Sequence, residues 1–121
     1  MFNLFHLSLK LSGFPIAKAQ ADFEKILQIS EADYPDYLEN KKREIVKFHQ
    51  KNNAFYQNLV GKDTFENWND LPVLTKKDLQ KPLKDRLSKG YSEKTVFVNK
   101  TSGSSGDPFV FAKDKEAHAI T

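Results

Sequence analysis

The chain of 121 residues contains no cysteine, which excludes disulfide bonds, thiolate zinc sites and catalysis by a thiol. No apolar run approaches the roughly eighteen residues that a membrane-spanning helix needs. The apolar first eleven residues lack the basic leader and the small-residue cleavage site of a secretory signal. These absences predict a soluble, cytoplasmic protein with no membrane span.

The composition is otherwise ordinary for a globular domain, with 39% apolar and 29% charged residues. Ten Phe, four Tyr and one Trp provide enough aromatic mass for a core and argue against global disorder. The net charge of +3 is too small to indicate a nucleic-acid partner. The basic stretch at 76–100 lacks an aromatic stacking platform, so we expect no nucleic acid to bind. The length suits one domain.

Hydrophobic spacing predicts two long helices, over 15–29 and 34–51. Pro15 and Pro35 suit the first turns of these helices, and Asp33 can cap the second. Apolar residues recur at spacings of three and four in both segments: Ile16, Ala19, Phe23, Ile26 and Leu27 in the first, and Leu38, Ile45 and Phe48 in the second. The short connection suggests an antiparallel helical hairpin. Apolar and polar residues alternate over 5–11 as in a strand, but the segment is rich in leucine as in a helix, so both assignments stay open.

The second half of the chain predicts shorter elements. Thr75 and Asp78 have the spacing of a capping box, which predicts a helix over 75–88 that Pro82 kinks or divides. Two β-rich runs flank a Gly/Ser stretch and predict a β-hairpin near 95–112. Asp114 can cap a further helix. The expected fold class is α+β: an N-terminal helical region (1–90), comprising the helical hairpin and short helices, then a segment (91–121) that begins a larger α/β domain.

The Gly/Ser stretch, which runs Thr-Ser-Gly-Ser-Ser-Gly-Asp-Pro over 101–108, is the main candidate for a binding site. Its two glycines allow successive backbone N–H groups to converge on an anion, and its hydroxyls add donors. It is not the common P-loop, because Gly-Lys-[Ser/Thr] is absent. The competing interpretation is an exposed turn or linker, for which this composition is common. The candidate phosphate-binding residues are Thr101, Ser102, Gly103, Ser104, Ser105 and Gly106.

Residues 101–108 also resemble the phosphate-binding signature of adenylate-forming (AMP-binding) enzymes, in which hydroxyl residues, two glycines and a proline occupy matching positions. Residues 68–79, Trp-Asn-Asp-Leu-Pro-Val-Leu-Thr-Lys-Lys-Asp-Leu, look like the segment that precedes this loop in phenylacetate–coenzyme A ligase and related capsular-polysaccharide biosynthesis proteins. The Phe55-Tyr56 pair fits the same subgroup. The resemblance covers roughly residues 14–121, and its specificity lies in the two motifs.

The resemblance implies an ATP-dependent ligase that converts a carboxylic acid into an acyl-adenylate, with Mg²⁺ as cofactor and coenzyme A as a candidate acceptor. It implies that residues 101–106 hold the β- and γ-phosphates of ATP and that 91–121 is the truncated start of the nucleotide-binding domain. The family's catalytic lysine and its adenine, ribose and metal ligands have no counterpart here. We therefore expect this chain to be an N-terminal fragment that is inactive alone, with no catalytic or metal-binding residues.

A non-enzymatic helical interaction module, whose Gly/Ser stretch is a structural turn, is the alternative function. His6, His49 and His118 have no metal-ligand spacing and are expected at or near the surface. The hairpin should have bare edges and faces, which predicts a homo-oligomer formed through it.

Overall fold

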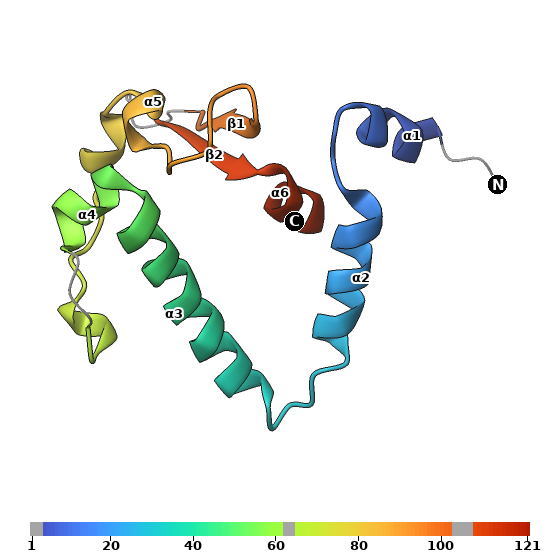
Figure 1. The fold of residues 1–121 in the computed structure, drawn as a ribbon, viewed down its shortest axis with the longest axis horizontal. Helices are drawn as coiled ribbons and strands as arrows, with labels where there is room; N and C mark the ends of the chain where they lie inside the picture. The colour runs from blue at the N-terminus through green and yellow to red at the C-terminus, as the bar shows by residue number, and fades with distance from the viewer. Residues whose placement is uncertain (1–3, 62–64, 103–107) are drawn as a thin grey trace.

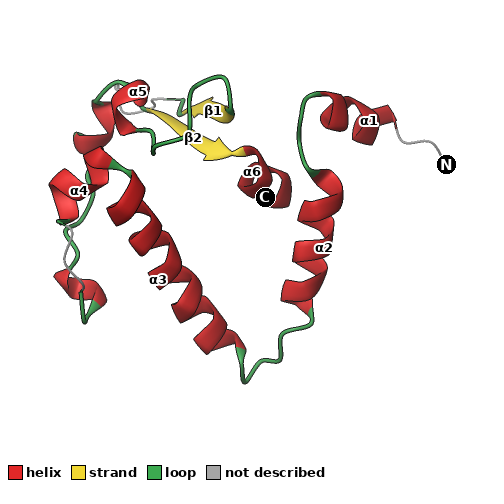
Figure 2. Cartoon of the chain, in the orientation of Figure 1, coloured by secondary structure: helices red, strands yellow, loops and turns green. Residues whose placement is uncertain are grey.

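A computed structural model describes residues 4–61, 65–102 and 108–121. The expected α+β class is confirmed, because helices precede an antiparallel two-stranded hairpin (Figure 2). In chain order, the elements are α1 (Leu4–Leu11), α2 (Ile16–Leu27), α3 (Tyr34–Asn52), α4 (Ala54–Val60), η1 (Trp68–Asp70), η2 (Asp78–Gln80), α5 (Leu83–Arg86), β1 (Val96–Lys100), β2 (Val110–Asp114) and α6 (Lys115–Ile120).

The two long helices form close to their predicted bounds, but they do not form an antiparallel helical hairpin. After the connection at residues 28–33, α3 diverges from α2 like the second arm of a V (Figure 1). The first turns of the apolar stripe of α2 pack on α6 instead, where Ala19 is 3% exposed, while Phe23 and Leu27 remain 46% and 68% exposed. The sequence pattern identified the apolar stripe of α2 but not the element that packs on its first turns.

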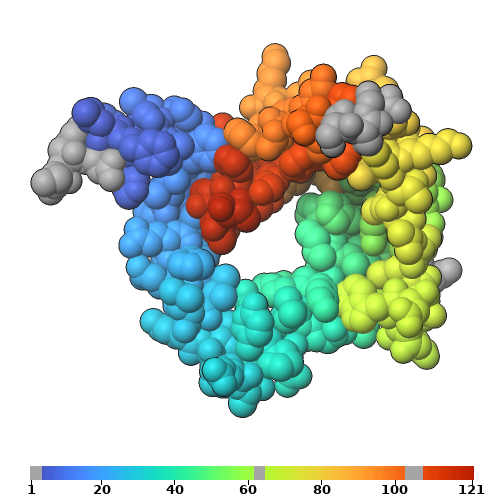
Figure 3. Space-filling view, turned by 180° about the vertical axis from the view of Figure 1, so that it is seen from behind, coloured from blue at the N-terminus to red at the C-terminus, as the bar shows by residue number. Residues whose placement is uncertain are grey.

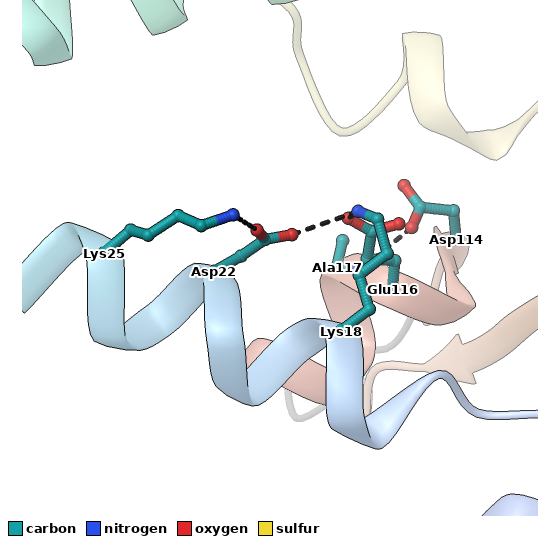
Figure 4. A network of polar contacts seen from close by, with 6 residues as sticks. All are labelled: Lys18, Asp22, Lys25, Asp114, Glu116 and Ala117. Carbon is teal, nitrogen blue, oxygen red and sulfur yellow. Dashed lines mark hydrogen bonds and ion pairs between the residues drawn. The ribbon is translucent and has the colours of Figure 1, made fainter.

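A polar cluster holds α6 against α2 (Figure 4). Lys18 forms ion pairs with Asp22, at 3.0 Å, and with Glu116. Asp22 also pairs with Lys25 at 3.0 Å. Beside this cluster, the ring of His118 stacks on Phe97 with centroids 3.6 Å apart. Exposed ion pairs contribute little individually, so the burial of Ala19 carries more of the contact between α2 and α6, while the ring stacking joins α6 to β1.

Pro82 divides the segment expected to be helical over 75–88, as predicted, but the helical stretches on either side are shorter than expected. The segment contains the 3₁₀ turn η2 and the single-turn helix α5, separated by an extended Lys81-Pro82 step. A proline disfavours helical backbone in the residue before it and lacks an N–H to donate, which explains the break. The capping-box bonds do form, because Thr75 N donates to the Asp78 carboxylate at 2.9 Å, but they close the turn that leads into η2.

The β-hairpin is confirmed. Its register pairs Val96 with Asp114 at one end and Lys100 with Val110 at the other. The predicted cap of the following helix is also present, because the Asp114 carboxylate accepts a hydrogen bond from Ala117 N at 2.7 Å. Residues 5–11, whose assignment was open, are helical.

The elements form an open frame instead of a compact globule. α2 and α3 are two sides, and the hairpin with α6 closes the frame above them; the space-filling view shows an opening through the middle (Figure 3). The accessible surface is 9368 Å², against about 6,700 Å² for a compact monomer of this length. Among the described residues, the buried apolar side chains are Ala19, Val46, Leu83 and Val96. No helix in the described ranges is long and apolar enough to cross a membrane.

Candidate functional site

The hairpin brings the two ends of the Gly/Ser loop together. Beyond the last strand pair, Thr101 N donates to Phe109 O at 3.0 Å, and Phe109 N donates to Thr101 Oγ1 at 3.0 Å. The Thr101 hydroxyl, a predicted phosphate ligand, therefore helps to close the base of the loop. Ser102 is exposed. The other predicted ligands, Gly103, Ser104, Ser105 and Gly106, lie outside the described residues.

A groove of about 360 Å³ adjoins the base of the loop. Pro108 and Phe109 line its hairpin wall, and Lys81 and Arg86 line the opposite wall, which the η2–α5 segment provides. Glu93 is the carboxylate residue that also lines this groove. Sequence reasoning did not select Lys81 or Arg86, because neither belongs to a motif and their proximity to the loop depends on long-range packing.

Arg86 anchors the helical segment to the hairpin. Its Nε donates to Lys81 O at 2.8 Å, and its Nη2 donates to Val110 O. Both acceptors are backbone carbonyls, so these bonds fix the guanidinium without neutralising its charge. Partial burial lowers the pKa of Arg86 from its ordinary value. The result is a positioned cation next to the residues that end the loop.

The segment with the second family-like motif packs on α3. Trp68 Nε1 donates to the Glu39 carboxylate at 3.0 Å. Arg43 also bonds to Glu39, with Nε 2.8 Å from Oε1, and its guanidinium lies 5.7 Å from the centroid of the Trp68 ring. Trp68 therefore serves here as a structural anchor, since its indole N–H and its ring both have partners on α3.

A second cavity, of about 320 Å³, lies at the other end of the hairpin, between α3, the α5–β1 connection and the start of α6. Buried Asn53 organises its floor. Asn53 Nδ2 donates to Arg86 O at 2.8 Å and to Ser88 Oγ at 3.0 Å, while its Oδ1 accepts from Tyr56 N at 2.9 Å. Asn53 thus caps α4 and joins it to the segment that leads into β1.

Ser88 and His49 resemble a nucleophile and base, but their surroundings indicate a structural pair. Ser88 Oγ lies 3.2 Å from His49 Nδ1, and Ser88 is 8% exposed. With Asn53 donating to Ser88, the hydroxyl is free to donate to neutral His49. In the described ranges, the hydrogen-bond partner of His49 is a serine and not a carboxylate, so the third group that orients a catalytic histidine is missing.

Burial lowers the pKa of His49 from 6.5, which predicts a pH-dependent stability. Below pH 6.5 the side chain of His49 is protonated more fully in the unfolded chain than in the folded one. The free energy of unfolding should therefore fall as the pH drops from 7.5 to 5.5. Chemical denaturation at both pH values measures the difference, and His49→Gln should reduce it. A variant with an unchanged pH dependence would show that His49 does not cause it.

The described residues contain no group of three or more His, Cys, Asp or Glu side chains arranged to hold a metal ion. A Mg²⁺ site would therefore need ligands other than such a cluster, such as phosphate oxygens and water. No family model, curated protein or solved structure matches the chain.

Proposed function

We propose that this chain supplies the phosphate-binding loop of an ATP-dependent, carboxylate-activating ligase of the adenylate-forming class. The observation that carries the proposal is the pairing of Thr101 with Phe109, which closes a Gly/Ser loop between two antiparallel strands. The groove beside this base has two cationic side chains, which favour a polyanion. A simple linker requires neither feature.

In this function ATP is a substrate: its α-phosphorus is attacked by a carboxylate oxygen, the bond to the β-phosphate bridging oxygen breaks, and pyrophosphate leaves. The loop residues bind and orient the β- and γ-phosphates, so that the leaving group is stabilised. Orienting the α-phosphate for attack needs contacts beyond these, and orientation contributes about 7–11 kcal/mol to such reactions. This chain alone is therefore expected to bind polyphosphate without forming an acyl-adenylate.

Amide-resolved NMR tests phosphate recognition. ATP and pyrophosphate, added at equal millimolar concentration, should each shift the amide signals of Gly103 and Gly106. Adenosine at the same concentration is the matched control and should leave both signals in place, because it carries no phosphate. Unchanged glycine signals with all three ligands would contradict the proposal and favour a structural turn.

The open frame supports a second candidate function, a helical interaction module. Large apolar side chains on α1 and α3 remain exposed, including Phe5 at 66% and Ile45 at 52%. Exposed apolar surface of this extent is typical of an interaction surface. The NMR experiment separates the two functions, because a module with a structural turn has no reason to recognise pyrophosphate.

A further inference from the structure

We propose that Lys81 and Arg86 form a second phosphate-binding element, in the groove beside Pro108 and Phe109, where the Gly/Ser loop ends. This inference rests on the proposed function and extends it to residues outside the loop. The ligand chemistry is a diphosphate group, whether it is part of a nucleoside triphosphate or free pyrophosphate.

The placement of the two cations is the first argument. α5 lies beside the start of β2 (Figure 1). Lys81 and Arg86 line one wall of the groove of about 360 Å³, and the residues that end the loop, Pro108 and Phe109, line the other. An anion bound in this groove would therefore lie beside both cationic side chains.

The second observation is that Arg86 is held in place and still has unused N–H donors. Two of its five N–H donors are used by the carbonyls of Lys81 and Val110, and these bonds hold the planar group in place. In the described part of the chain, no carboxylate forms an ion pair with it. A partly buried guanidinium with free donors and no paired charge is suited to bidentate binding of phosphate oxygens.

The charges near Lys81 do not cancel its contribution. Its Nζ lies 5.4 Å from the centroid of the Phe55 ring, a contact that leaves the ammonium charge intact. Asp78 is electrostatically close, but its carboxylate is hydrogen-bonded to Thr75. Glu93 opposes the two cations, so the charged side chains that line the groove among the described residues carry a net charge of +1. Two cations against one carboxylate leave a net positive charge, which favours an anion.

Calorimetric titration of the full chain with pyrophosphate tests the proposal. Lys81→Gln and Arg86→Gln should each weaken pyrophosphate binding by about fivefold to tenfold, because each removes a charge-assisted bond. Lys84→Gln is the matched control. It removes the same charge from an exposed position on α5 that does not line the groove, so its affinity should change by less than about twofold. ATP and AMP as further ligands separate a diphosphate requirement from nucleotide recognition.

The variants distinguish this inference from the proposed function. If pyrophosphate shifts the Gly103 and Gly106 signals while Lys81→Gln and Arg86→Gln bind like Lys84→Gln, the inference is wrong and the loop alone recognises phosphate. If the two variants lose affinity while the glycine signals never move, the groove binds phosphate and the proposed function fails. Arg86→Gln also removes the two hydrogen bonds that Arg86 donates to backbone carbonyls. If Arg86→Gln unfolds, Lys81→Gln tests the inference, because in the described residues the Lys81 side chain donates no such bond.

Discussion

Replacing Asn53 with alanine is expected to lower the free energy of unfolding by about 2–4 kcal/mol. The side chain is 5% exposed and makes three hydrogen bonds, one of which caps α4. Alanine removes the cap and leaves the carbonyl of Arg86 and the hydroxyl of Ser88 without this donor. Small domains have only about 5–15 kcal/mol of stability, and this chain has few buried apolar side chains. The expected loss is therefore a large share of the total free energy of unfolding.

Urea denaturation followed by circular dichroism measures this effect, and two variants separate its causes. Asn58→Ala, at an exposed position of the same helix, should change the free energy by less than about 0.5 kcal/mol. Asn53→Ser keeps an oxygen that can cap α4 but removes the two donated bonds, so its loss should be intermediate. If Asn53→Ala and Asn58→Ala are equally stable, Asn53 does not join α4 to the segment that leads into β1.

The elements that the sequence predicted correctly are those specified by local signals. α2 and α3 follow from a repeat near 3.6 residues with a proline at the start, and α6 begins after a capping aspartate. The hairpin follows from two β-rich runs around a Gly/Ser loop. Each signal involves residues close in sequence, so it does not depend on how the rest of the chain packs.

The arrangement of these elements was not predictable, because it depends on contacts between distant residues. Leu38, Ile45 and Phe48 were expected on the apolar face of the second helix, yet they are 40%, 52% and 38% exposed. The opposite side of α3 is covered instead, where Trp68 bonds to Glu39. A pattern of apolar spacing shows which face of a helix can be buried, but it does not identify the element that buries it.

The candidate site shows the same division. The composition of the loop identified a potential anion site, and the hairpin register confirms that its ends meet at Thr101 and Phe109. Arg86 is joined to the start of β2, next to the loop, through a bond to Val110, 24 residues later in the chain. No periodicity or motif marks that pairing, since it arises when the break at Pro82 turns α5 towards β2.

Self-association through the hairpin is the second large effect that we expect. The sheet contains only β1 and β2 among the described residues, so the outer edge of each strand is unpaired, and Val98 is 40% exposed. The accessible surface exceeds that of a compact monomer by about 2,700 Å². A stable dimer needs to bury only about 800 Å² on each partner. Pairing of two hairpin edges would cover apolar side chains and satisfy backbone donors together.

Sedimentation velocity over a hundredfold range of concentration measures this association, and three glutamate variants locate the surface. Val98→Glu should weaken dimerisation by about tenfold or more, because it places a charge where an apolar side chain is buried. Val73→Glu, at a position 87% exposed and outside the hairpin, is the control and should associate like the original chain. If Ile45→Glu disrupts the dimer while Val98→Glu does not, α3 forms the interface and the hairpin assignment is wrong. A sedimentation coefficient that stays constant at the monomer value would show that the open frame is stable without a second copy.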